Sequence, residues 1–180
     1  DDKAEAGDVF DPGTGDYTVS LWFKRPQGGL LSSDQVLISK GNRFSTREGW
    51  SVNFSNSTNE IRFRVNSSDD SSERASTEVN VPQDDQWHHL VLVVDRADND
   101  VRGYLDGDNS VWRSGGGGPS SSSLSSVTDI STDDPFTVGA VRDGTNTYYE
   151  FEGLVDEVRL YDRVLTEVEI AALGDPVANA

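Results

Sequence analysis

Cysteine is absent from the chain, which excludes disulfide bonds and thiolate metal sites. Histidine occurs only twice, at the adjacent positions His88 and His89. Because successive side chains of a strand point to opposite faces, these two imidazoles are not expected to bind one metal ion. No G-x-S-x-G motif is present, so nucleophilic catalysis is not indicated either. No apolar run approaches the roughly 20 residues that cross a bilayer, which argues against direct membrane insertion.

Basic residues are also few. The chain has 15 Lys and Arg residues against 32 Asp and Glu residues, and its lysines are Lys3, Lys24 and Lys40. The net charge of −17 repels nucleic acids, so we expect no nucleic-acid partner. Such a surface stays soluble at very high salt, where the repulsion between its own charges is screened. The composition resembles that of proteins from extreme halophiles, and the alternative is an ordinary acidic extracellular domain.

The C-terminal part of the chain predicts a long strand followed by a short helix. Residues 154–161 combine Val, Leu and Tyr with charges, and strict alternation puts Leu154, Asp156, Val158 and Leu160 on one face. Thr166 and Glu169 have the spacing of a capping box, in which each side chain accepts from the other residue's amide. Gly174 ends the predicted helix.

Turn residues at regular intervals, with almost no helical periodicity, predict an all-β sandwich of two antiparallel sheets. We expect a flexible leader at 1–8, one domain at 9–174 with a Gly/Ser-rich internal loop at 114–126, and a tail at 175–180. The other predicted strands cover residues 17–25, 35–40, 50–54, 61–65, 75–81, 87–94, 101–105, 111–113, 136–141 and 148–151.

Three blocks of the sequence resemble one known family. They are GDYTVSLWFK from Gly15, QWHHLVLVVD from Gln86 with YLDG from Tyr104, and FEGLVDEVRLYDRVLTEVEI from Phe151. In this order they resemble laminin-G-like domains of the concanavalin A-like lectin/glucanase superfamily. The resemblance implies a jelly-roll sandwich. Members of this family commonly begin with a further strand, for which only residues 1–10 remain, so that strand is either very short or replaced by another chain.

The resemblance also implies a place for Ca²⁺, which such domains often bind at the rim or near the last strand. It points to Asp156, with Asp11 and Asp16 in the turn before the first strand as companions. Calcium prefers carboxylate and carbonyl oxygens, which suits these residues. In the alternative interpretation, Asp156 orders the backbone while Asp11 and Asp16 only form a turn.

Binding a carbohydrate needs an exposed aromatic side chain beside polar groups, although most tryptophans of a sandwich lie in its core. We exclude Trp87 from the ligand-binding candidates, because it lies in a sequence block that forms part of the domain core in this family. Asn53, Asn56 and Asn66 begin N-x-S/T triplets, which are glycan acceptors on surface loops if the chain is exported. The predicted ligand-binding residues are Trp22, Trp50, Trp112, Arg142, Asp143, Asn146 and Tyr148.

The resemblance implies a non-catalytic module, extracellular or at the cell surface, that binds a glycan or a surface protein. One alternative is a structural or assembly subunit of a surface, appendage or virion structure, which uses an exposed sheet edge for contacts. A glycan-cleaving enzyme is a third interpretation, with Glu150 and Glu152 as the carboxylates that could share one face of a strand.

Overall fold

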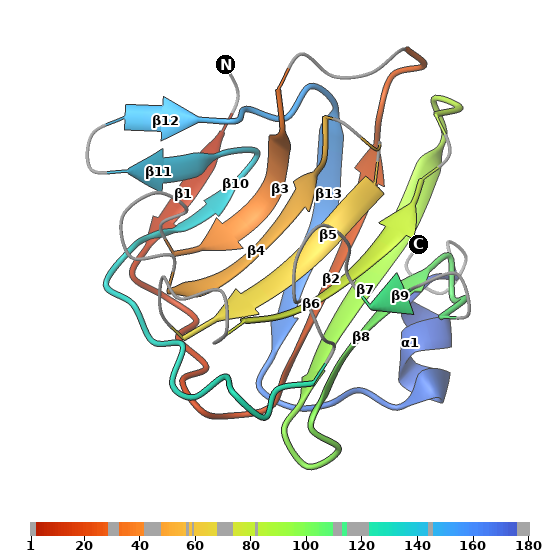
Figure 1. Ribbon diagram of the computed structural model, residues 1–180. Coiled ribbons are helices and arrows are strands. Elements are labelled where there is room, and N and C mark those ends of the chain that lie inside the picture. The colour runs from red at the N-terminus through yellow and green to blue at the C-terminus, as the bar shows by residue number, and fades with distance from the viewer. Residues whose placement is uncertain are drawn as a thin grey trace.

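The computed structural model describes residues 3–28, 33–41, 48–56, 58, 60–67, 74–81, 83–109, 113–114, 123–143 and 146–175. Two antiparallel sheets and one short helix form a jelly-roll sandwich, with the larger sheet crossing in front of the smaller one in Figure 1. The larger sheet has the order β1-β10-β3-β4-β5-β6-β9 and the smaller one β13-β2-β7-β8, while β11 and β12 form a separate hairpin. The elements are β1 (Ala4–Gly7), β2 (Tyr17–Lys24), β3 (Gln35–Lys40), β4 (Gly49–Phe54), β5 (Glu60–Asn66), β6 (Arg74–Asn80), β7 (Trp87–Asp95), β8 (Asp100–Leu105), β9 (Arg113–Ser114), β10 (Phe136–Val138), β11 (Val141–Asp143), β12 (Asn146–Tyr148), β13 (Leu154–Tyr161) and α1 (Glu167–Leu173).

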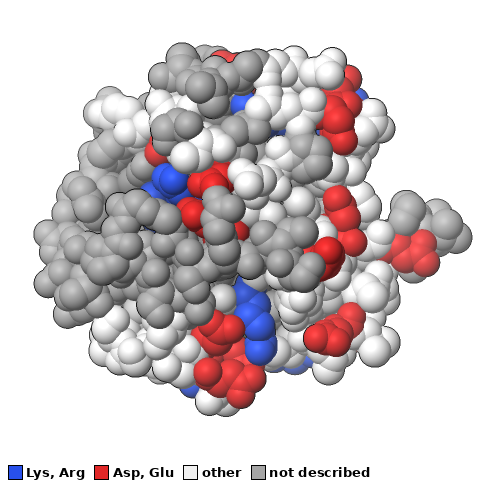
Figure 2. All heavy atoms as spheres, turned by 45° about the vertical axis from the view of Figure 1, so that its right-hand side comes forward, with Lys and Arg blue, Asp and Glu red and all other residues white. Residues whose placement is uncertain are grey.

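Acidic side chains are spread over the surface rather than collected in one patch. Figure 2 shows several separate acidic groups on the face that it displays, and the larger basic groups adjoin acidic ones. Ion pairs account for this arrangement: Arg102 contacts Asp95 at 2.6 Å, and Lys24 contacts Asp85 at 3.3 Å. These basic side chains are therefore paired with acidic neighbours. The excess of acidic residues leaves the net charge negative, which repels polyanions.

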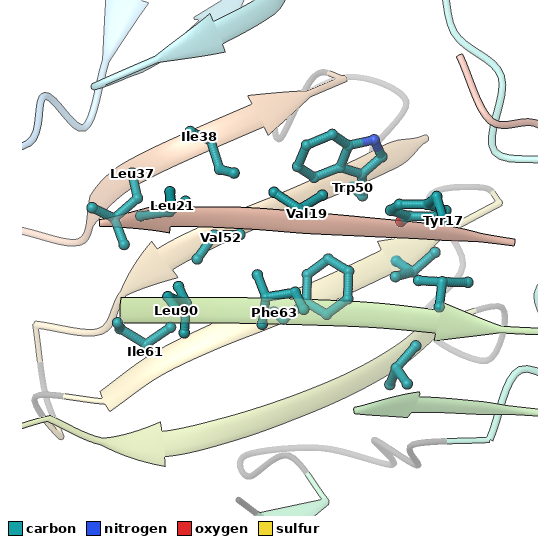
Figure 3. Packing of buried hydrophobic residues seen from close by; sticks show 14 of the residues in the cluster. Tyr17, Val19, Leu21, Leu37, Ile38, Trp50, Val52, Ile61, Phe63 and Leu90 are labelled. Carbon is teal, nitrogen blue, oxygen red and sulfur yellow. The ribbon is translucent and has the colours of Figure 1, made fainter. Parts of the chain in front are cut away.

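The core lies between the two sheets, as the alternation of apolar residues along the strands predicts. Figure 3 shows side chains from β2 and β7 meeting those of β3, β4 and β5. Every second residue of β2 points into this layer and is fully buried, namely Tyr17, Val19, Leu21 and Phe23. Burial of such side chains stabilises the fold by about 1.5–3 kcal/mol each.

Several predicted boundaries differ from the structure, and the strand predicted at 148–151 is found at Asn146–Tyr148 as β12. Residues 4–7, expected in a flexible leader, form β1 and pair with β10, so the family's early strand is present and very short. The single strand predicted at 136–141 is divided into β10 and β11 at Gly139. This glycine has a φ of 82° and donates its amide to the Leu37 carbonyl, a backbone conformation that favours glycine.

A β-bulge in β13 changes which side chains face the core. Asp156 lies opposite Trp22 and Arg159 opposite Ser20, so three steps along β13 match two along β2. Glu157 takes the extra position with a left-handed φ of 53°. Strict alternation was therefore the wrong prediction for this strand. The side chains of β13 that pack on the core are Val155, Val158 and Leu160.

Helix α1 covers only part of the outer face of the smaller sheet. Its capping box is formed as predicted, since the Thr166 hydroxyl accepts from the Glu169 amide and the Glu169 carboxylate accepts from the Thr166 amide. Ile170 and Leu165 pack on Val91 and Val93 of β7, together with Tyr104. Among the described residues, no helix is long and apolar enough to span a membrane. In the described part of the chain, the other end of this outer face is left open.

Candidate functional site

The open end of the outer face carries two tryptophans. The strand register places two rows of side chains there: Leu154, Lys24 and Trp87 in one row, and Asp156, Trp22 and His89 in the next. Gly174, directly after α1, marks the border, because a Cβ at this position would lie 3.0 Å from His89 Nδ1. We call the surface formed by Trp22, Lys24, Trp87, Leu154 and Asp156 the tryptophan face.

Large apolar side chains of the tryptophan face are exposed to solvent. Trp87 is 41% exposed and Leu154 is 56% exposed, while Trp22 is half-buried. The Trp22 ring packs on His89 with a centroid distance of 5.1 Å, which fixes one side of the indole against the sheet. The prediction that Trp87 belongs to the core was therefore wrong. Trp87 begins β7 in register with Lys24, whose side chain lies outside the sandwich, and strand parity alone would have revealed this.

Charged groups surround the two indoles. The Lys24 ammonium pairs with Asp85, and Arg159 pairs with Glu157. The Asp156 carboxylate accepts from the Glu157 amide at 2.8 Å and is exposed. The regular pairing of Leu154 to Asp156 with β2 puts Asp156 on the same surface as Trp22, which lies directly opposite it. Side chains at directly opposed positions have Cβ atoms about 4.5–5.5 Å apart, so a small ligand group reaches both.

The two histidines behind this surface differ in their surroundings. His89 is 1% exposed; its Nε2 lies 2.9 Å from the Ser20 hydroxyl, and its Nδ1 has no hydrogen-bond partner among the described residues. Burial, opposed by Asp106 and assisted by Arg159, lowers the pKa of His89 to about 4. The ring is therefore neutral at pH 7 and packs against Trp22 with an interplanar angle of 34°.

His88, on the core side of the same strand, is bound by two carboxylates. Its Nδ1 lies 2.8 Å from Asp106 and its Nε2 lies 3.1 Å from Asp84. Burial lowers the pKa of His88, but these hydrogen bonds outweigh burial and the pKa is raised. Since the carboxylates approach different ring nitrogens, this group orders the β7–β8 end of the sheet rather than chelating one metal ion. Both histidines are thus buried, on opposite faces of β7.

A second group of predicted ligand residues lies together on the β11–β12 hairpin. Tyr148 is 39% exposed, and the Arg142 guanidinium pairs with Glu5 of β1. Asp143 and Asn146 are opposite each other in the backbone register. This hairpin is a sheet of its own, separate from the smaller sheet that carries the tryptophan face, so the predicted ligand residues divide between two surfaces.

The remaining predicted aromatic residues do not contribute to either surface. Trp50 is 3% exposed and packs on Tyr17 and Phe136, so its assignment to a ligand site was wrong. Trp112 lies outside the described residues. Asn53 is fully buried and is not a surface glycan acceptor, whereas Asn56 and Asn66 are half-buried.

The three aspartates proposed to bind calcium are not brought together. Asp16 adjoins the first residue of β2, and Asp156 lies opposite Trp22 near the other end, roughly 20 Å along the strand. Asp16 accepts from the Arg96 amide at 2.7 Å, and Asp11 accepts from the Thr132 amide at 3.2 Å. Among the described residues, no group of three His, Cys, Asp or Glu side chains could hold a metal ion. These carboxylates do not fit a shared calcium site.

Cationic side chains donate hydrogen bonds to the backbone carbonyl oxygens near these aspartates. The fully buried Lys40 ammonium donates to the carbonyls of Thr132 and Asp134 at 2.8 and 2.7 Å, and to the Asp8 carboxylate. The Arg96 guanidinium donates to the carbonyls of Val127, Thr128 and Gly13. The chain thus supplies its own positive charge where the N-terminal turn meets the segment before β10.

Two carboxylates also lie on the outer face of the larger sheet. Glu60 and Glu78 are 4% and 2% exposed, and both contact Arg62, at 3.5 and 3.2 Å. A guanidinium in contact with two buried carboxylates compensates their charge, which favours a structural ion-paired group. Glu150 and Glu152 do not share a strand face, because they lie in an irregular segment after β12. No sequence pattern indicated that Glu60 and Glu78 lie together. The pairing of β5 with β6 brings these two carboxylates to the same arginine.

Comparison with known proteins agrees with this architecture. The family model Laminin_G_3, described as the concanavalin A-like lectin/glucanases superfamily, matches residues 1–171. A comparison with curated proteins finds no match. The fold resembles that of a sialidase carbohydrate-binding module, CBM40, from Ruminococcus gnavus bound to α2,3-sialyllactose, with a TM-score of 0.64 and 13% identity over 97% of each chain.

Two further solved structures share the fold. The binding domain of botulinum neurotoxin serotype G has a TM-score of 0.68 and 13% identity, over 96% of this chain and 39% of the toxin chain. A heptameric SAP-like pentraxin from Limulus polyphemus has a TM-score of 0.62 and 14% identity, over 92% of this chain and 72% of the pentraxin. This chain thus spans well under half of the toxin chain. These similarities establish a lectin-like jelly-roll fold of the kind found in carbohydrate- and protein-binding modules.

Proposed function

The chain belongs to the Laminin_G_3 family of the concanavalin A-like lectin/glucanase superfamily, and from this premise we propose that it is a non-catalytic glycan-binding module. The module acts outside the cell or at its surface, where glycans are presented. Its acidic surface, with a net charge of −17, suits a high-salt environment.

One observation supports this proposal above the others: Trp22 and Trp87 lie on the same open end of one sheet, beside Asp156. The apolar face of a sugar ring, formed by its C–H groups, stacks on an indole, and its hydroxyls donate to a carboxylate. Exposed apolar side chains that are grouped and bordered by polar ones mark binding sites. The tryptophan face provides both parts of such a site on rigid strands.

The solved structures with the same fold are in keeping with the proposal. The Ruminococcus gnavus module is bound to sialyllactose in its solved structure, and another botulinum neurotoxin binding domain is in complex with rat synaptotagmin II. A glycan partner thus occurs with a module of this fold, and a protein partner with a longer chain that contains the fold. Tryptophans beside a hydrogen-bonding carboxylate favour the glycan for this chain.

The proposal is tested by calorimetric titration with neutral oligosaccharides, beginning with the trimer of N-acetylglucosamine. Trp22→Ala and Trp87→Ala are each expected to weaken binding by at least tenfold, because each removes a stacking surface. Tyr148→Ala is the matched control, since it removes a similarly exposed aromatic ring from the β11–β12 hairpin. Binding that depends on Tyr148 and not on the tryptophans would refute this assignment of the site.

A protein contact is the second candidate, and the 56% exposure of Leu154 favours it. Leu154 begins β13, an edge strand of the smaller sheet, so an apolar partner surface or another strand could pack there. Light scattering after gel filtration separates the two functions. A defined multimer without sugar, dissociated by Leu154→Asp, would support an assembly subunit in place of a glycan-binding module.

A further inference from the structure

We propose that the tryptophan face selects glycans that carry protonated amino groups over glycans that carry carboxylates. This inference rests on the proposed glycan-binding function and names the ligand class for the same site. It assigns to this chain a preference opposite to that expected for sialylated ligands, which are anionic.

The charges on the tryptophan face favour a cation. Lys24 on this face and Arg159 in the adjoining row each have an acidic partner, since Lys24 contacts Asp85 and Arg159 contacts Glu157. Asp156 is exposed, and its carboxylate accepts a hydrogen bond from a backbone amide. The site therefore holds one more acidic than basic group within this set, and the net charge of −17 adds repulsion toward anionic ligands.

The tryptophans strengthen the same preference. The face of an indole attracts an ammonium group through its quadrupole, and tryptophan does so best among the aromatic side chains. Trp22 lies directly opposite Asp156 across the β2–β13 pair, so an ammonium group bound by the carboxylate lies close to the indole. Trp87 is diagonal to Trp22 and gives a second stacking surface for the next sugar ring.

The expected preference is modest because the site is exposed. An exposed ion pair and an exposed cation–π contact each favour binding by up to about fivefold. The two together correspond to a preference of about tenfold at low salt. Screening should reduce this preference as the salt concentration rises.

Calorimetric titration of the full chain at low salt and pH 6 tests the inference with three probes of similar size. These are the trimer of glucosamine, the trimer of N-acetylglucosamine, and α2,3-sialyllactose. We expect the glucosamine trimer to bind about tenfold more tightly than its N-acetylated form, and sialyllactose to bind most weakly. Asp156→Asn should abolish the difference between the two trimers, because an amide still accepts from the Glu157 amide but carries no charge to hold the ammonium group against the Trp22 indole.

The control is Asp133→Asn, which removes an exposed carboxylate from the segment before β10 and should leave the preference unchanged. Equal binding of the two trimers, or a preference that survives Asp156→Asn, overturns the inference while leaving the glycan-binding function intact. If none of the three probes binds, both the inference and the proposed function fail. Tighter binding of sialyllactose than of either trimer also overturns the inference.

Discussion

Protonation of His89 should destabilise the protein in mild acid. This ring is 1% exposed, its Nδ1 has no hydrogen-bond partner among the described residues, and burial lowers its pKa to about 4 from an ordinary value of 6.5. In the unfolded chain His89 takes up a proton near pH 6.5, whereas in the folded chain it does so only near pH 4. Between these values the unfolded state binds more protons, so the free energy of unfolding falls as the pH falls.

The size of the effect follows from the difference between the two pKa values. A change of one pKa unit corresponds to about 1.36 kcal/mol, so the full effect of His89 is about 3 kcal/mol, of which about 2 kcal/mol is lost between pH 7 and about pH 4.5. Urea unfolding of the wild type and of His89→Gln at these two pH values measures it. The variant should lose about 2 kcal/mol less than the wild type.

His88→Gln is the matched control with the opposite sign. Burial lowers the pKa of His88, but hydrogen bonds to Asp106 and Asp84 raise it overall, so its contribution to stability is present in acid and is lost as the pH rises through the raised pKa. Removing it should make the loss of stability in acid steeper. An unchanged pH dependence in His89→Gln, or equal effects of the two substitutions, would refute the reasoning about the two environments.

Two further predictions concern Lys40 and the effect of EDTA. Lys40→Met should lower the free energy of unfolding in urea by about 3 kcal/mol, because it leaves the Thr132 and Asp134 carbonyls without their charged donor. Lys24→Met, which breaks an exposed ion pair, should cost less than about 1 kcal/mol, and equal losses would contradict the assigned role of Lys40. EDTA should leave the thermal midpoint unchanged, because Asp11 and Asp16 accept from backbone amides; a clear decrease in differential scanning fluorimetry would show that a bound metal ion stabilises the fold.

Much of the fold could be predicted from local patterns. Alternating apolar residues identified the buried face of β2, and the Thr166–Glu169 spacing identified the start of α1. Asp106 and Gly107 both take positive φ in a tight turn after β8, as their residue types favour, but the next strand, β9, pairs with β6 rather than returning beside β8. What local patterns could not show is the bulge in β13, because strict alternation fits its sequence as well as the bulged register does.

The candidate site was only partly predictable. Trp22 and Asp156 were chosen for separate reasons, one as an aromatic platform and the other as a calcium ligand, and the strand register places them opposite each other. Trp50 was expected at the ligand site and is buried, whereas Trp87 was expected in the core and is exposed. The position of a residue within a sequence block does not show which face of its strand is covered by another layer. The Glu60–Arg62–Glu78 group depends on pairing between strands and has no sequence signature.

Nuclear magnetic resonance of the indole N–H groups tests the central claim most directly. The chain has four tryptophans, so it gives four indole signals that single Trp→Phe variants assign. As an oligosaccharide that binds the protein is added, the signals of Trp22 and Trp87 should shift together, while that of the buried Trp50 stays in place. Saturable binding that leaves the Trp22 and Trp87 signals unmoved would contradict the claim that the tryptophan face is the ligand site.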